Sequence, residues 1–218
     1  TMSIGYVGST ISGGTFDGSI RNAGGTISGG MFYGSITNTN GGEIKGIIVT
    51  YKDGNADYAK QVLQSGGTAT KPNEPARDGY VFLGWYNGDT PYDFTDPVTG
   101  DMTLTAKWAK LCDKTADFTA ADGGAEAIAL LNSTKTGADD SMWDNGTKTL
   151  TMKGVSFATT ATTAVKLPDG ATVILADGTE NRIIGGGATA AQDGAYTNKL
   201  YIYGIYAAGA LTVQGEKA

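Results

Sequence analysis

Residues 77–86 read RDGYVFLGWY and residues 102–108 read MTLTAKW, and these two stretches decide the fold of the middle of the chain. Both alternate between two sets of side chains at a period of two residues, which is typical of β-strands. In the second stretch the apolar set is Met102, Leu104, Ala106 and Trp108. Trp85 and Trp108 share this register with aliphatic neighbours. The pattern therefore favours core positions for both tryptophans over a sugar-stacking platform.

The surrounding sequence extends this pattern to residues 47–108. Residues 50–55 read TYKDGN, which predicts a strand running into an Asp-Gly turn, and the prolines of this region fall between the predicted strands. With its two decisive stretches, the region resembles the Listeria–Bacteroides repeat, the B-repeat module of internalin-type surface proteins. The resemblance implies a small β-grasp-like domain and a surface or adhesin architecture rather than a metabolic enzyme.

Residues 1–46 form an internal repeat with a period of 16 residues. Isolated apolar residues recur between glycines, as Ile4/Ile20/Ile36, Ile11/Ile27 and Phe16/Phe32. A single copy cannot bury its own apolar face, whereas stacked copies can place like residues in columns. The repeat therefore predicts a parallel β-solenoid. A flexible low-complexity linker is the alternative, and the regular placement of Ile and Phe argues against it.

Residues 109–218 predict a second solenoid. A short helix is expected at Gly124–Asn132, where it could cap an open solenoid end. The strand-like stretch TLTMKG at 149–154 recurs as ALTVQG at 210–215, and the spacing from Met152 to Leu175 fits one solenoid turn of roughly 20 to 25 residues. The fold class predicted for the whole chain is all-β with minor α, with parallel β-solenoid or β-helix segments flanking a β-grasp-like module.

The stretch VILADGTEN at 173–181, with the tyrosine-rich stretch and the LTVQG stretch after it, resembles carbohydrate-binding right-handed β-helix proteins of the polygalacturonate-binding type. Several members of that group use calcium. The resemblance places Asp177 and Glu180 in its acidic turn, with Asn181 beside them. Tyr201 and Tyr203 fall on one side of a strand and Tyr206 follows, so exposed rings could stack on sugars. Tyrosines that merely cover a solenoid flank are the alternative.

Composition excludes several classes of site. Histidine is absent, which removes the Ser-His-Asp triad and imidazole metal sites, and Cys112 is the sole cysteine, so no intrachain disulfide can form. The formal net charge of −6 makes nucleic acid or an anionic membrane a poor partner. No stretch approaches the ~18 consecutive apolar residues of a membrane span.

The carboxylates leave binding and catalysis to be weighed. A β-helix lyase needs acidic calcium ligands with a basic residue, and a hydrolase needs two facing carboxylates. Asp139, Asp140 and Asp144 cluster before a strand, and Asp177 shares a turn with Glu180. Asp also stabilises solenoid corners by bonding its own backbone, which is the simpler explanation. We expect no enzyme activity and no organic cofactor, and calcium stays open as a ligand.

The sequence as a whole predicts a bacterial cell-surface or secreted adhesin-type protein that binds extracellular glycan through its C-terminal solenoid. A structural stalk, a protein-binding adhesin and, less favoured, a polysaccharide lyase or hydrolase are the alternatives. The expected partners are an extracellular polysaccharide or a host glycan or protein. Neither end of the chain shows a polar cap, which predicts a piece of a longer protein or end-to-end contacts between copies.

Overall fold

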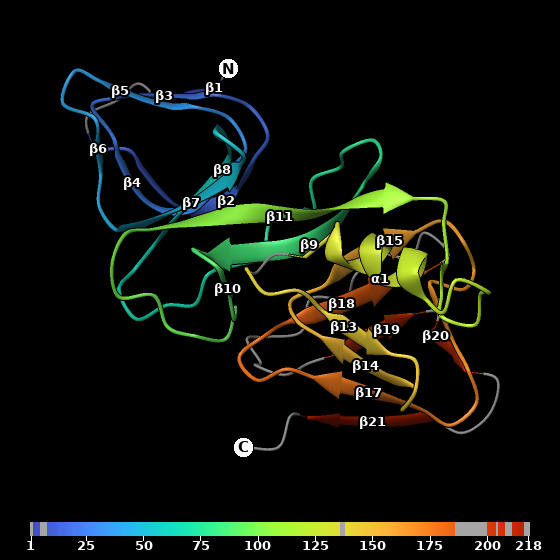
Figure 1. Cartoon of the computed structure of the whole chain (residues 1–218). Coiled ribbons are helices and arrows are strands. Elements are labelled where there is room, and N and C mark those ends of the chain that lie inside the picture. The colour runs from blue at the N-terminus through green and yellow to red at the C-terminus, as the bar shows by residue number, and fades with distance from the viewer. Residues whose placement is uncertain are drawn as a thin grey trace. The chain divides into compact units, whose positions relative to one another are not determined.

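A computed structural model describes residues 2–4, 8–135, 138–185, 200–203, 205–207 and 211–215 (Figure 1). The chain divides into two compact units. The described residues up to Pro75 and those from Gly84 to Lys107 form the first unit, and those from Ala76 to Leu83 and from Trp108 onward form the second. Strands dominate both units, and the described residues contain a single helix. The all-β prediction with minor α is therefore confirmed.

The 16-residue repeat builds two short parallel sheets in the first unit. We call its copies rung 1 (residues 3–18), rung 2 (19–34) and rung 3 (35–46). One sheet has the order β1 (Met2–Ile4), β3 (Ile20–Ala23), β5 (Ile36–Thr39). In the other, β4 (Thr26–Phe32) pairs in parallel with β2 (Thr10–Phe16) and with β6 (Glu43–Ile44). Each rung thus contributes one strand to each of the two sheets.

Most of the predicted apolar columns form. Ile20 pairs with Ile36 and Ile11 pairs with Ile27. The rings of Phe16 and Phe32 stack with centroids 5.0 Å apart and an angle of 8° between their planes. Ile27 and Phe32 are fully buried, because rung 2 has a neighbour on both sides. The columns therefore bury apolar surface that no single rung could bury alone.

The first member of one predicted column is wrong. Met2, not Ile4, pairs with Ile20, and Ile4 pairs with Asn22. Residues 5–9 connect Ile4 to Thr10, whereas residues 23–25 connect Asn22 to Thr26, so the first connection is longer by two residues. A shift of two residues keeps the same side chains on the same face of a strand, so it preserves the alternation that the prediction relied on.

The middle of the chain adds the longer strands β7 (Ile47–Asp53), β8 (Ala56–Leu63), β9 (Tyr80–Asn87) and β11 (Met102–Cys112), and the two-residue strand β10 (Thr90–Pro91). β7 and β8 form an antiparallel hairpin whose turn contains Gly54 at φ 61°, and β11 runs parallel to β7. Tyr51 on β7, Trp85 on β9 and Leu104 on β11 are fully buried. Trp85 packs edge-on against Tyr51 at 5.1 Å, which confirms its predicted core position.

A shared sheet joins the repeat to this middle region. β4 pairs antiparallel with β8, with Gly30 opposite Val62 and Phe32 opposite Lys60. Val62 belongs to the same apolar cluster as Ile20, Ile27 and Phe32. The predicted boundary between residues 46 and 47 therefore separates two sequence patterns, but both lie in one compact unit.

The second unit contains three parallel sheets. The first pairs the end of β11 with β15 (Ser156–Thr159), followed by β18 (Asn181–Ile184) and β19 (Leu200–Tyr203). The second has the order β12 (Ala116–Asp117), β16 (Val165–Leu167), β20 (Ile205–Ala207). The third has β14 (Thr149–Met152), β17 (Ala171–Leu175) and β21 (Leu211–Gly215), with β13 (Met142–Asp144) antiparallel to β14.

The chain visits these three sheets in a repeating cycle. It passes from β14 to β15 to β16, then to β17 and β18, and later from β19 to β20 to β21. Met152 lies opposite Leu175, as the spacing predicts. Large side chains from all three sheets meet in one fully buried core that includes Leu150, Phe157 and Leu167.

Helix α1 (Ala125–Asn132) covers part of this core, close to the predicted range. Gly124 precedes it at φ 88°, where a Cβ atom would lie 2.9 Å from both Phe118 and Trp143. Asp122 accepts hydrogen bonds from the backbone N–H groups of Gly124 and Glu126, at 3.0 and 2.7 Å. These bonds lower the pKa of Asp122, and a carboxylate at a helix N-terminus is stabilising. Leu131 anchors the helix in the core.

Candidate functional site

The predicted acidic turn connects β17 to β18 in the second unit. Asp177 is exposed, and Gly178 follows it at φ 70°. The hydroxyl of Thr179 donates a 2.7 Å hydrogen bond to the carbonyl of Ala176, which closes the turn. Asp177 and Glu180 thus share a turn, as the sequence predicts, but their surroundings differ.

Glu180 faces inward and pairs with a buried arginine. The side chain of Arg182 is 2% exposed, and its Nε and Nη2 atoms lie 2.7 and 2.5 Å from the same Glu180 oxygen. Its Nη1 donates a 2.6 Å hydrogen bond to the backbone carbonyl of Leu83 on β9. A buried guanidinium needs such partners, because an unpaired charge in the interior is very unfavourable. Glu180 therefore neutralises a structural arginine.

Asn181 also serves the interior. It is 0% exposed, and its Oδ1 accepts a 2.9 Å hydrogen bond from the backbone N–H of Val155. Its Nδ2 donates to the Thr179 hydroxyl at 3.2 Å and to the Met152 carbonyl at 3.5 Å. The amide is thus committed to backbone and turn groups, as buried polar groups must be. This burial removes Asn181 from the candidate ligand contacts.

The three candidate tyrosines lie on the last strands of the second unit. Tyr201 and Tyr203 belong to β19, where they pair with Arg182 and Ile184, and Tyr206 belongs to β20 opposite Lys166. Their side chains lie outside the described residues, so their role as sugar contacts stays a prediction.

In the second predicted acidic group, Asp139, Asp140 and Asp144, the contacts of Asp140 and Asp144 are with residues nearby in the sequence. Asp140 pairs with Lys135, and Asp144 accepts hydrogen bonds from the backbone N–H groups of Gly146 and Thr147, at 2.8 and 3.2 Å. The bonds from Thr147 and Gly146 lower the pKa of Asp144. This is the turn chemistry expected of aspartate at a corner. Within the described residues, no three acidic or cysteine side chains gather as a metal site would require.

A different cluster presents an aromatic surface in the second unit. Tyr80 is 40% exposed, and the guanidinium carbon of Arg77 lies 5.4 Å from its ring centroid. The same carbon lies 4.7 Å from the ring of Trp108, which packs against Phe82 at 5.4 Å. We call Arg77, Tyr80 and Trp108 the aromatic–arginine cluster. Trp108 is half-buried, so it differs from the fully buried Trp85.

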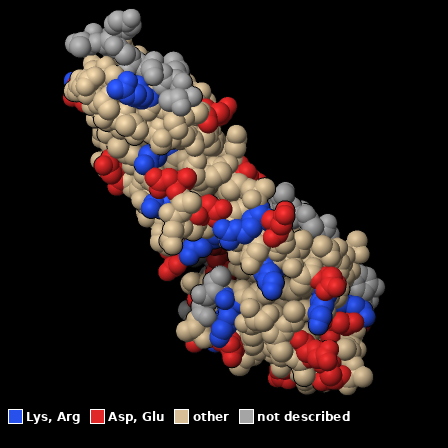
Figure 2. All heavy atoms as spheres, turned by 90° about the horizontal axis from the view of Figure 1, so that it is seen from above, with Lys and Arg blue, Asp and Glu red and all other residues tan. Residues whose placement is uncertain are grey.

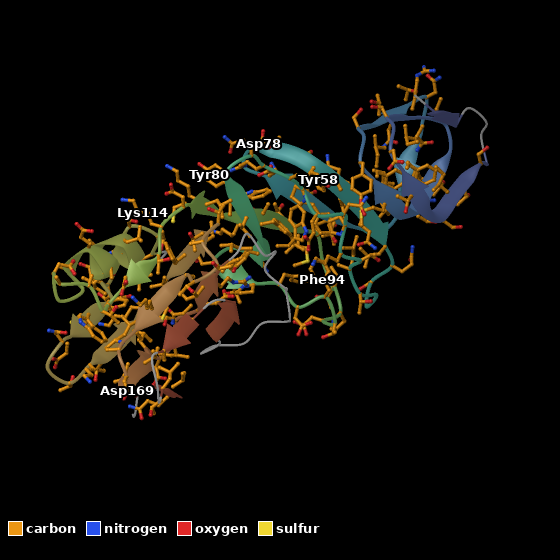
Figure 3. All side chains as sticks on the ribbon, turned by 90° about the vertical axis from the view of Figure 1, so that its right-hand side faces the viewer. Tyr58, Asp78, Tyr80, Phe94, Lys114 and Asp169 are labelled. Atoms are coloured by element: carbon orange, nitrogen blue, oxygen red, sulfur yellow. The ribbon has the colours of Figure 1, made fainter. Side chains whose placement is uncertain are left out.

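A tight turn fixes this cluster at the start of β9. The backbone N–H of Tyr80 donates to the carbonyl of Arg77 at 3.1 Å, and Gly79 between them has φ 75°. The carbonyl of Gly79 accepts a 2.8 Å bond from Leu111 on β11. Tyr80 and Asp78 lie at the margin of the ribbon in Figure 3. The RDGY sequence signals this turn, but it does not reveal that Arg77 reaches Trp108.

Each unit also contains a pocket among its described residues. The first unit has a cavity of about 430 Å³ that is lined in part by Ile36, Ile44, Ile48, Val62 and Met102. The second has one of about 370 Å³ beside α1, lined in part by Asp117 and Glu126. Asp117 accepts hydrogen bonds from Thr119 and Lys166, so its carboxylate already has internal partners.

Charge is spread over the surface. On the face drawn in Figure 2, Lys and Arg side chains are interspersed with Asp and Glu. Among the described residues, oppositely charged side chains form exposed pairs such as Lys60–Asp57 at 2.8 Å and Lys107–Asp89 at 3.2 Å. In the part of the chain that the structure describes, no helix is long and apolar enough to cross a membrane.

Comparisons with known proteins identify the middle region. A protein of Evansella cellulosilytica described as a Gly-rich membrane protein is 37% identical over 71 residues, which are 30% of this chain and 8% of that protein. A second membrane protein of the same organism is 33% identical over 72 residues, which are 31% of this chain and 11% of the relative. The chain thus matches only a small share of either relative. Residues 48–107 match the Listeria–Bacteroides repeat domain, as the sequence resemblance indicates.

Proposed function

We propose that this chain is part of a bacterial cell-surface protein of the adhesin type that binds extracellular glycan through its second unit. The match of residues 48–107 to the Listeria–Bacteroides repeat domain supports a surface role, because the repeat is typical of surface proteins. The two relatives described as membrane proteins agree with that location. The same proposal places the described domains outside the cell.

The architecture that we infer is two parallel β-solenoid segments flanking a β-grasp-like module. The parallel pairing of successive rungs supports a solenoid at residues 2–46, and the three-sheet cycle supports another in the second unit. Parallel strands joined by short corners display side chains in regular rows on flat faces. Such faces suit an extended polymer, because equivalent contacts recur along its length.

The observation that carries glycan binding is the exposed aromatic–arginine cluster. Sugar rings have apolar faces, and an exposed aromatic ring such as Tyr80 can pack against one of them. Arg77 beside it adds a positive charge, which attracts a negatively charged polymer. The two together fit an acidic polysaccharide whose sugar units carry carboxylates. The C-terminal tyrosines Tyr201 and Tyr203 are the second candidate contact in the same unit.

The proposed mechanism is binding without turnover. Glu180 is held by Arg182, and Asp144 accepts backbone hydrogen bonds in its own turn. A hydrolase would instead present two carboxylates that face each other across a sugar bond. These contacts support a structural role for the acidic residues, with the ligand held by ring stacking and guanidinium bonds.

The test measures binding of polygalacturonate and of neutral glycans by calorimetry, with calcium and again with a chelator. We expect binding to the acidic polymer, and we expect Tyr80→Ala or Arg77→Ala to weaken it at least tenfold. Met142→Ala removes another exposed apolar side chain of the same unit, 58% exposed, and should leave binding unchanged. Loss of binding in Tyr201→Ala with Tyr203→Ala, but not in the cluster variants, would move the site to β19.

A structural spacer is the second candidate function. The observation that favours it is that Glu180 and Asn181 bond Arg182 and the backbone of Val155 within the protein. These bonds stabilise corners and hold no ligand. Absence of binding to every glycan in both conditions would support the spacer and contradict the glycan proposal.

A further inference from the structure

Strand β5 is an internal sheet edge in the first unit. Within the described residues it pairs with β3 alone, so the sheet β1-β3-β5 ends there (Figure 1). After β5 the chain returns to the other sheet in β6 and continues there into β7. The edge strand reads ITNT and carries no charge. Proteins usually block a free edge with charge or proline, so this edge is open to an added strand.

The pairing of β5 with β3 determines which backbone groups of β5 face outward. The N–H of Ile20 donates a 2.8 Å hydrogen bond to the carbonyl of Ser35. Because bonding direction alternates along a parallel ladder, the N–H and C=O groups of Ile36 and Asn38 point away from β3. The equivalent groups of β3 belong to Ile20 and Asn22, sixteen residues earlier, and they face β5. The outer edge of β5 thus repeats an edge that already binds a strand.

The side chains on the inner face repeat the same arrangement. Ile20 lies opposite Ile36, and Asn22 lies opposite Asn38. The Nδ2 of Asn22 donates to the Oδ1 of Asn38 at 2.9 Å. Asn22 is fully buried, whereas Asn38, the last of this column, is exposed. A parallel strand with an aliphatic residue and an asparagine two positions later would continue both columns.

A cavity adjoins the place that the aliphatic residue of such a strand would take. Its volume is about 430 Å³, and its lining includes Ile36 of β5, Ile48 of β7 and Val62 of β8. Strands β8 and β7 follow β4 on the side opposite β2, which is the side of rung 3. Ile36 and Ile48 are half-buried, so part of their apolar surface meets water. An aliphatic side chain placed beside Ile36 would cover some of that surface, which favours binding.

We propose that β5 binds an extended, uncharged peptide segment of a partner protein as an additional parallel strand. The segment carries an aliphatic residue followed two positions later by asparagine, as β5 itself does. Hydrogen bonds to the backbone of Ile36 and Asn38 supply affinity, and the cavity and the asparagine column select the side chains. This site lies in the first unit and does not depend on glycan binding by the second.

A titration of the full chain with the peptide SITNTN, its ends blocked, tests the edge by NMR. We expect saturable binding and slower hydrogen exchange at the amides of Ile36 and Asn38, while the amides of β14 should not change. The peptide NTNTIS has the same composition in reverse order. It should bind at least tenfold more weakly, because a parallel strand of that sequence places asparagine next to Ile36.

A variant of the cavity gives the second measurement. Thr103 is exposed and lines the cavity, so Thr103→Arg introduces a charge where the aliphatic side chain would bind, and it should weaken peptide binding at least tenfold. Thr105→Arg is the matched control, because Thr105 is on the same strand and the same face. It should bind the peptide like the unmodified chain, and melting temperatures should show that both variants keep the fold.

Three results would overturn the proposal: no saturable binding, equal binding of the two peptides, or a Thr103→Arg protein that binds like the unmodified chain. Without peptide, the exchange of the Ile36 and Asn38 amides should not depend on protein concentration. Protection that rises with the concentration of the chain itself would identify a second copy as the occupant and overturn a separate partner.

Discussion

The N-terminal repeat and the second unit both stack parallel rungs, and each places a fully buried asparagine beside a corner. Asn22 and Asn181 are both 0% exposed. The Oδ1 of Asn22 accepts from the backbone N–H of Gly25 at 3.1 Å, and its Nδ2 donates to Asn38 at 2.9 Å and to the carbonyl of Glu43 at 3.2 Å. Asn181 makes the corresponding bonds to Val155 and Met152. The same polar solution therefore supports corners in both regions.

The two regions differ in what fills the space between their sheets. The repeat has a small cluster of Ile20, Ile27, Phe32 and Val62. Its backbones approach so closely that Gly29, Gly34 and Gly42 allow no side chain. The second unit encloses a larger core of aliphatic and aromatic side chains, with α1 packed against it. A 16-residue rung leaves little interior, so close backbone stacking takes over from side-chain packing.

The largest predicted effect falls on the second unit. Glu180→Ala leaves the Arg182 guanidinium buried without its carboxylate, and breaking a buried pair costs about 3–5 kcal/mol. Urea unfolding followed by circular dichroism should show the loss, and hydrogen exchange should localise it to β18 and β9. Asp177→Ala is the control in the same turn, where the side chain is exposed and a smaller change is expected. Equal losses in the two variants would contradict this assignment.

A smaller effect should fall on the first unit alone. Gly29→Ala places a methyl group against the Ser12 carbonyl, and overpacking of this kind costs roughly 1–3 kcal/mol. Thermal melting should show the decrease, with amide protection lost in β2 and β4 and retained in β14 and β17. Gly100→Ala has open space and should melt like the unmodified chain. An unperturbed Gly29→Ala protein would mean that the rungs are not stacked by close backbone contact.

The smallest effect is a loss of stability in acid that both units share. The hydrogen bond from Lys60 lowers the pKa of Asp57 in the first unit below its usual 3.8. In the second unit burial pushes the pKa of Asp117 up, but the bonds from Thr119 and Lys166 outweigh it and lower the pKa below 3.8. A lowered folded-state pKa contributes stability that is present above the unfolded value and lost as pH falls through the folded value.

Unfolding midpoints should therefore stay nearly constant above pH 5 and fall below about pH 4. In the Asp57→Asn variant the first unit should lose less stability in acid than it does in the unmodified chain. In the Asp117→Asn variant the same should hold for the second unit. Asp57 is exposed and Asp117 is half-buried, so the effects are small and reduced by salt. A midpoint that rises on acidification in the unmodified chain would contradict the expected loss of stability in acid.

Local patterns predicted much of the fold because they report local requirements. Alternating apolar residues located the strands around Trp85 and Leu104, and the alanine- and leucine-rich stretch located α1. The register was less accessible, because alternation at a period of two cannot distinguish a shift of two residues. Two predicted alignments are off by two residues in this way. Ile4 pairs with Asn22 and not with Ile20, and Thr149 aligns through Thr172 with Thr212 and not with residue 210.

The candidate site was harder to predict because its contacts join distant residues. Asp177 and Glu180 were placed in one turn, which the structure shows, but the partner of Glu180 sets its role. Arg182 bonds a carbonyl 99 residues away, and no short-range pattern signals that contact. The aromatic–arginine cluster likewise depends on Arg77, just before the turn at the start of β9, reaching Trp108 on β11.

The close stacking of the rungs also has a genetic consequence. Rung 2 contacts rung 1 through Gly29 and Gly34, and the equivalent Gly13 and Gly18 of rung 1 have open space beside them. The same positions therefore allow one rung to stack on another. A duplication of sixteen codons within this region would insert one more rung without new corners or a new core. A deletion of the same length would remove one. The segment is thus able to vary in length between related genes in steps of a single rung, while the module that follows it keeps its fold.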